Sequence, residues 1–202
     1  SGHYEVSLIG GDTTRGPLNI TITMFGIVEN SKAMKRSGAR PGDGVYVSGT
    51  IGDAGFCFWK LSNGLIPSNQ ELKRLNCPIP RVELGLVLKN LASACIDLSD
   101  GLEQDLSHIL KASSVGAVIE VEKIPISEAL LGHIKDTNDW SIPLCGGDDY
   151  ELCFTVPEDK EEALKKLSES CNVNITRIGV VTESLGLQIK GFDGSRKSYQ
   201  HF

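Results

Sequence analysis

Three loops of the sequence place acidic side chains next to glycine or serine. They are GGDTTRGP (Gly10 to Pro17), DLSDG (Asp97 to Gly101) and GGDDYE (Gly146 to Glu151). Carboxylate oxygens on loops are typical ligands of Mg²⁺, which completes its octahedron with phosphates and waters, and a glycine pair lets the backbone approach a ligand closely. Zinc is disfavoured, because no His or Cys pair has the spacing of zinc ligands. The residue types therefore favour Mg²⁺, although each loop taken singly is explained equally well as a turn.

The DLSDG loop carries more negative charge than the start of a helix requires. Asp100 is a suitable N-cap for a helix that begins at Leu102, because a short acidic side chain can accept the N–H groups of the first turn. This leaves Asp97, at the end of a predicted strand, without a structural role. The loop is therefore a candidate metal site as well as a cap.

Several common active-site signatures are absent from the sequence. It contains no GxxxxGK[ST] phosphate loop and no GxSxG nucleophile motif, and its four histidines have no evident serine or cysteine partner. The segment GTIGDAG (Gly49 to Gly55) is only loosely similar to a dinucleotide fingerprint, and a plain turn is the favoured interpretation. No covalent nucleophile is expected.

The elements that position these loops follow from the apolar pattern. Leu18 to Val28 alternates as a half-buried strand does, and the apolar pattern then stops until Asp43. We therefore expect residues 1–38 to be the remnant of an N-terminal domain and residues 39–202 to form a C-terminal α/β domain. The second part alternates strands with helices and ends in hairpin signals, which predicts a mixed β-sheet covered by helices.

One helix of the second part is predicted most clearly. Leu102, Leu106, Ile109 and Leu110 follow the spacing of one helical face, and Gly116 is expected to end that helix.

Composition excludes some classes of protein. The formal net charge of −6 over 202 residues offers no basic stripe for nucleic acid. No apolar run reaches the length of a membrane span, and the start of the chain has no signal-peptide pattern. Six cysteines without a CxxC pair are typical of buried thiols in a reducing compartment. We expect a cytoplasmic protein, and the absence of an initiator methionine suggests a fragment.

Together, the loops and their flanks closely resemble the thiamine-monophosphate kinase family, which belongs to the superfamily of aminoimidazole ribonucleotide synthetase and selenophosphate synthetase. The resemblance runs from about Tyr4 to Phe202 and rests on LIGGDTTRGPL, KRSGARPGD, YVSGTIGDA, CIDLSDGL, GGDDYELCFTVPE and the terminal HF. It implies the C-terminal domain of the aminoimidazole ribonucleotide synthetase-like fold. It also implies transfer of the γ-phosphate of ATP to thiamine monophosphate, several Mg²⁺ ions, and a homodimer built through the N-terminal domain.

The resemblance also implies roles for individual residues. Asp97 and Asp100 bind Mg²⁺, Ser99 and Arg36 contact ATP, and Gly11 with Asp12 binds the metal–nucleotide complex. An exposed charge in a linker is the alternative interpretation of Arg36. Arg15 and Asp53 are left without an assigned role.

For the phosphate acceptor, the resemblance points to Asp148 and Tyr199. Asp148 stands where the family usually has a glutamate, one methylene longer, and Tyr199 is the aromatic residue before the terminal HF. A turn acid and a hydrophobic plug at the chain end are the alternative interpretations. Because other family ligands lie outside this sequence, we expect the chain alone to be inactive. A related ATP-dependent enzyme with another acceptor and a non-catalytic binding fragment remain as alternative functions.

Overall fold

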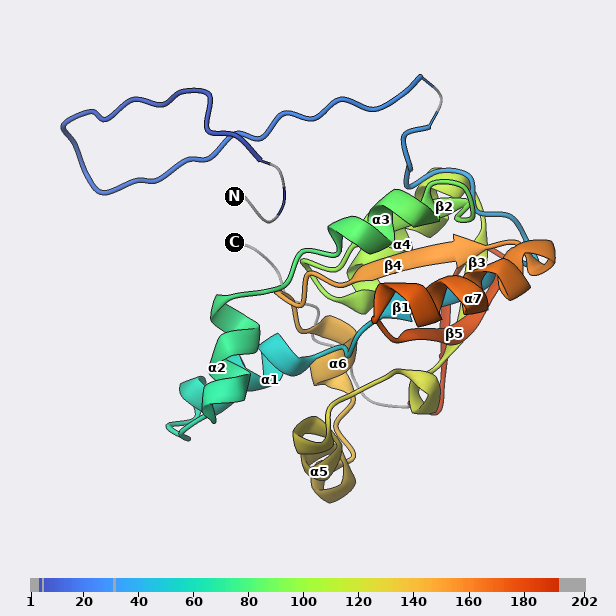
Figure 1. Ribbon diagram of the computed structural model, residues 1–202. Helices are drawn as coiled ribbons and strands as arrows, with labels where there is room; N and C mark the ends of the chain where they lie inside the picture. The colour runs from blue at the N-terminus through green and yellow to red at the C-terminus, as the bar shows by residue number, and fades with distance from the viewer. Residues whose placement is uncertain (1–3, 5, 31, 193–202) are drawn as a thin grey trace. The chain divides into compact units, whose positions relative to one another are not determined.

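The structure is a computed structural model that describes residues 4, 6–30 and 32–192 (Figure 1). The chain divides into two compact units, Ser1–Ala33 and Met34–Phe202. Each unit is described by itself below.

The division lies five residues before the boundary expected from the sequence, and hydrogen bonds explain the position. The N–H of Cys95 donates to the carbonyl of Lys35 at 2.9 Å. The hydroxyl of Ser113 accepts the N–H of Gly38 at 3.1 Å. These bonds attach the segment after Ala33 to the second unit.

The first unit contains no helix or strand within residues 6–30. Leu18, Ile20 and Ile22 are 94%, 81% and 80% exposed, so the strand predicted for Leu18 to Val28 is wrong. An alternating segment becomes a strand only when another strand accepts its hydrogen bonds, and the described residues of this unit provide none.

The second unit is built on one six-stranded sheet in the order β2-β4-β1-β5-β3-β6. All neighbouring strands are antiparallel except β3 and β6, which are parallel. The strands are β1 (Gly44–Ser48), β2 (Ala94–Asp97), β3 (Gly116–Glu120), β4 (Leu152–Val156), β5 (Ile175–Thr182) and β6 (Gly186–Lys190). The predicted mixed sheet is confirmed.

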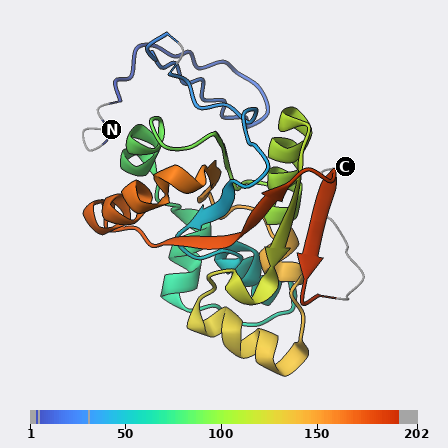
Figure 2. The same cartoon turned by 90° about the vertical axis from the view of Figure 1, so that its right-hand side faces the viewer.

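Helices cover both faces of this sheet (Figure 2). They are α1 (Asp53–Ser62), α2 (Asn69–Asn76), α3 (Val82–Leu88), α4 (Leu102–Ser113), α5 (Glu128–Thr137), α6 (Ser141–Cys145) and α7 (Glu161–Cys171), with short 3₁₀ helices η2 (Val121–Lys123) and η3 (Glu158–Lys160). Within the described residues, none of the helices combines the length and the apolar character needed to cross a membrane.

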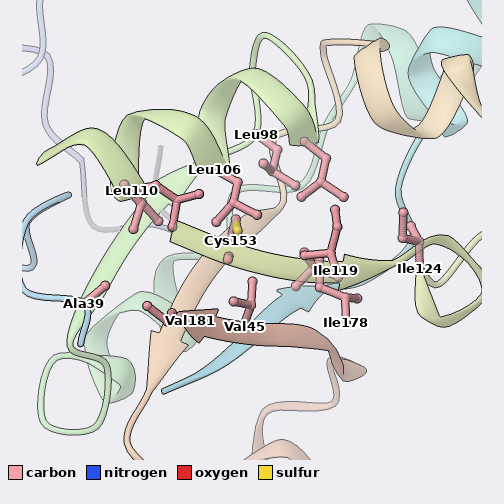
Figure 3. Close-up of a cluster of buried hydrophobic side chains, with 14 of the residues drawn as sticks. Ala39, Val45, Leu98, Leu106, Leu110, Ile119, Ile124, Cys153, Ile178 and Val181 are labelled. Atoms are coloured by element: carbon pink, nitrogen blue, oxygen red, sulfur yellow. The ribbon is translucent and has the colours of Figure 1, made fainter. Parts of the chain in front are cut away.

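The main core lies between α4 and the sheet (Figure 3). Val45 and Val47 of β1 face α4, whereas Tyr46 between them packs with α3 and α7 on the opposite face, as the alternation of a strand requires. The predicted apolar face of α4 is confirmed, because its four residues are at most 3% exposed: Leu102, Leu106, Ile109 and Leu110. This packing anchors the helix that follows the DLSDG loop.

The predicted end of α4 is wrong by two residues. Ser114 takes the left-handed conformation that ends the helix, with φ of 56°, and Gly116 is already the first residue of β3. A short polar residue can adopt this conformation at modest strain.

Candidate active site

A cavity of about 500 Å³ lies where the segment after Ala33 passes the end of β2 and the start of α4. It brings together four residues predicted from the sequence, namely Arg36, Asp97, Ser99 and Asp100. Its other lining residues are Met34, Lys35, Cys95, Ile96, Asp105 and His108. Two basic residues, Lys35 and Arg36, and three aspartates therefore line the same space.

A buried side chain of α4 shapes the DLSDG loop. Oδ2 of Asp105 accepts the backbone N–H groups of Ser99 and Asp100, each at 3.0 Å, and Asp105 is 2% exposed. Gly101, with φ of 105°, is the residue that precedes the helix, and no side chain caps it. The predicted N-cap role of Asp100 is therefore wrong, because Gly101 occupies the N-cap position and no side chain makes a cap hydrogen bond there.

The electrostatics around this loop are strongly negative. Burial raises the pKa of Asp105, and the charges of Asp100 and Asp97 raise it further, while hydrogen bonds from the backbone of Asp100 and Ser99 lower it. The negative charge of these three aspartates favours a ligand that binds together with metal cations.

The GGDDYE loop lies directly beside the DLSDG loop. The N–H of Asp148 donates to the carbonyl of Ser99 at 3.0 Å, and the N–H of Tyr150 donates to that of Leu98 at 2.8 Å. A Cβ atom at Gly147 would lie 2.4 Å from the carbonyl oxygen of Ser99, so only glycine allows the two backbones to approach this closely. Two loops that are distant in sequence therefore form one edge of the site.

The acids of the GGDDYE loop point in different directions. Asp148 is exposed, whereas Asp149 and Glu151 are 2% and 1% exposed. Glu151 forms a bidentate pair with Arg81, with bonds of 2.6 and 2.7 Å, and also accepts the hydroxyl of Ser48 at 2.6 Å. Among these three acids, only Asp148 is placed to meet a ligand from solvent.

Asp149 connects the loop to the glycine-rich turn before α1. Its carboxylate accepts the N–H groups of Gly52 at 2.6 Å and Ala54 at 3.2 Å. These amides bind a side chain of the protein, which supports the interpretation of GTIGDAG as a structural turn. Asp53 in this turn is also buried, and it accepts the hydroxyl of Thr50.

Three acids of the site are not among the residues predicted from the sequence, namely Asp105, Asp149 and Glu151. One sequence signal exists for two of them, because Asp149 and Glu151 stand in the same acid-bearing GGDDYE loop as the predicted Asp148. Asp105 has no comparable local signal, since its partners lie five and six residues earlier in a loop.

The remaining predicted residues lie elsewhere. Gly11 and Asp12 belong to the first unit, where Asp12 accepts the N–H of Thr13 at 2.7 Å. Tyr199 lies outside the described residues.

The carboxylates of the cavity fit Mg²⁺ in kind. Within the described part of the chain, no three His, Cys, Asp or Glu side chains form a group that could by itself hold a metal ion. Mg²⁺, however, is usually bound by one or two carboxylates together with phosphates of its substrate. Asp97 and Asp100 in one cavity supply that number of hard oxygen ligands.

The fold and this site can be compared with known proteins. The family described as AIR synthase related protein, C-terminal domain, matches residues 40–191, and the chain belongs to that family. The chain is also similar to the thiamine-monophosphate kinase of Salmonella typhimurium, with 42% identity over 214 residues that cover 99% of this chain and 65% of that protein. It thus spans about two thirds of the length of this curated relative.

Solved structures show the same relationship. The thiamine-monophosphate kinase of Stenotrophomonas maltophilia K279a matches with a TM-score of 0.77 and 38% identity, over 83% of this chain and 56% of that chain. AaThiL complexed with AMPPCP and TMP matches with a TM-score of 0.70 and 30% identity, over 84% of this chain and 54% of that chain. The resemblance to the thiamine-monophosphate kinase family is confirmed.

Proposed function

We propose that the chain forms part of a Mg²⁺-dependent kinase that transfers the γ-phosphate of ATP to thiamine monophosphate and yields thiamine diphosphate. The observation that carries the proposal is the convergence of Arg36, Asp97, Ser99 and Asp100 on one cavity. The names of the similar proteins and the nucleotide analogue and TMP in one similar structure support the substrates.

The cavity residues then have separate tasks. Asp97 and Asp100 hold Mg²⁺, Arg36 and Ser99 contact ATP, and Gly11 with Asp12 binds the metal–nucleotide complex. Mg²⁺, when bound, would neutralise negative charge on the phosphates. The protein groups orient the two phosphates in line, which is the main requirement of this reaction, and no covalent nucleophile is needed.

The acceptor binds at Asp148, with Tyr199 as its aromatic contact. Thiamine monophosphate carries a thiazolium cation, which a carboxylate and an aromatic face attract. Asp148 is exposed beside the Ser99 backbone, which supports a position next to the nucleotide.

The wider organisation is part of the same proposal. Residues 1–38 belong to an N-terminal domain through which the kinase forms a homodimer, and residues 39–202 form the C-terminal domain. The kinase acts in the cytoplasm.

The test is a chimera in which this chain replaces its matched part of the Salmonella typhimurium enzyme. We expect the chimera to form thiamine diphosphate from ATP and thiamine monophosphate in the presence of Mg²⁺, and the 202-residue chain alone to give no turnover. Turnover of another phosphate acceptor only, with thiamine monophosphate inert, would assign the chain to a related enzyme. A folded chimera that binds ATP and transfers phosphate to nothing would indicate a binding role.

A further inference from the structure

Two residues of the GGDDYE loop have an unusual backbone conformation. Among the described non-glycine residues, five have a positive φ, and three of these end helices: Ser114, Asn138 and Asn172. The other two are Asp148, with φ of 67°, and Tyr150, with φ of 52°. A left-handed conformation is uncommon for a bulky side chain, so the surrounding structure must impose it on Tyr150.

The residue between them has the contacts to impose it. Asp149 is 2% exposed, and its carboxylate accepts the N–H groups of Gly52 and Ala54 at the start of α1. The guanidinium of Arg74 lies 3.9 Å from the same carboxylate. Two hydrogen bonds and a nearby cation thus hold this side chain inward.

Holding Asp149 inward directs its two neighbours outward. Asp148 and Tyr150 are both exposed, and the Tyr150 hydroxyl donates to Oδ1 of Asp148 at 3.3 Å. Partial burial raises the pKa of Tyr150, and the charges of Asp148, Asp97 and Asp100 raise it further. Through the backbone bonds of Asp148 to Ser99 and of Tyr150 to Leu98, the pair lies next to the acidic loop of the candidate site.

We propose that Asp149 is a positioning residue, which anchors the GGDDYE loop to the start of α1 and thereby holds Asp148 and Tyr150 in their left-handed conformations beside the DLSDG loop. Its effect on acceptor binding rests on the proposed kinase function. Its effect on the conformation of the loop backbone is independent of that function.

The first experiment therefore measures the loop in the 202-residue chain by NMR. In Asp149→Asn the amide oxygen can accept only one of the N–H groups of Gly52 and Ala54, and the NH₂ group, itself a donor, faces the other. We expect faster amide hydrogen exchange at these two residues, and chemical shifts of Asp148 and Tyr150 that no longer report a positive φ. Unchanged φ at both residues would overturn the proposal.

A matched control separates positioning from general destabilisation. Asp43 is also a buried aspartate, 4% exposed, and it accepts the N–H of Arg40 at 3.0 Å and the hydroxyl of Ser93 at 2.5 Å. It directly precedes the first residue of β1, whereas Ser48 is the last residue of that strand. Asp43→Asn should lower thermal stability and leave the φ of Asp148 and Tyr150 positive. A change of φ in this control as well would also overturn the proposal.

The second experiment measures both KM values in the chimera. We expect Asp149→Asn to raise the KM for thiamine monophosphate by about 10- to 100-fold, the scale for a displaced binding group, with the KM for ATP unchanged. Asp43→Asn should change neither KM. Equal loss for both substrates, with the loop displaced, would contradict the acceptor side of the proposal. If the wild-type chimera does not turn over, the kinase proposal fails while the NMR result still decides the positioning role.

Discussion

The backbone N–H of Asp100 donates to the buried carboxylate of Asp105 at 3.0 Å, so one acid of α4 fixes the position of another acid in the preceding loop. The same oxygen of Asp105 accepts the N–H of Ser99. Asp105 thus fixes the backbone of the loop that precedes α4, and Ser99 and Asp100 of this loop line the cavity. The geometry of the candidate site depends on a residue that contacts the loop through its backbone.

We expect Asp105→Ala to lower the free energy of unfolding of the second unit by about 1–3 kcal/mol, because two backbone donors lose a charged acceptor. Asp105→Asn should cost less, since its amide oxygen can still accept one of the two N–H groups. Urea unfolding of the three chains provides the measurement. Equal stability of all three would show that water replaces the carboxylate without loss.

Asp97 offers a test of the proposed metal site. Asp97→Asn in the chimera keeps the shape of the side chain but removes a charge, so we expect the rate to fall by orders of magnitude at ordinary Mg²⁺. The melting temperature should change little or rise, because repulsion between Asp97 and Asp105 is relieved. Near-normal activity would reject Asp97 as a ligand, and collapse of stability would favour a structural role.

Substitutions of the proposed acceptor residues should affect the KM for thiamine monophosphate and not the KM for ATP. We expect Asp148→Asn in the chimera to raise the KM for thiamine monophosphate and to leave the KM for ATP nearly unchanged. Tyr199→Ala should weaken thiamine monophosphate binding by roughly 1–2 kcal/mol, the scale of cation–π contacts, whereas Tyr199→Phe should cost little. Loss of ATP affinity with acceptor affinity intact would place these residues on the nucleotide side.

The raised pKa of Asp149 predicts that the free energy of unfolding depends on pH. Burial raises its pKa to about 7, against the lowering effects of the Gly52 and Ala54 amides and of Arg74, while Asp53 raises it further. Since the folded state then binds the proton more tightly than the unfolded state, the contribution of Asp149 to stability is full below about pH 4 and is lost as pH rises through 7.

The difference in unfolding free energy between wild type and Asp149→Asn isolates this contribution. Measured by urea unfolding, the wild type should lose stability relative to Asp149→Asn between about pH 4 and pH 7. A difference that stays constant over this range, or that changes in the opposite direction, would contradict the raised pKa.

Local sequence determined those features that depend on neighbouring residues. The apolar face of α4 follows directly from the spacing of Leu102, Leu106, Ile109 and Leu110, because a helix places those residues on one side. The short motif CIDLSDGL likewise predicts a strand, an acidic loop and a helix in that order, and the structure has all three. Pattern alone was insufficient for Leu18 to Val28, where the described residues supply no strand to pair with the alternating segment.

Tertiary structure decided which acids face the site and which are buried beneath it. In the sequence, Asp148 and Asp149 are adjacent identical residues, so the sequence does not tell which of them is buried. The sequence likewise makes Asp100 a suitable helix cap and Asp105 an ordinary helix residue. Asp149 is buried because its hydrogen-bond donors, 97 and 95 residues away, arrive at the start of α1 through the packing of the sheet and its helices. A buried carboxylate requires such donors and an exposed one does not, so its environment, which only the fold creates, determines its role.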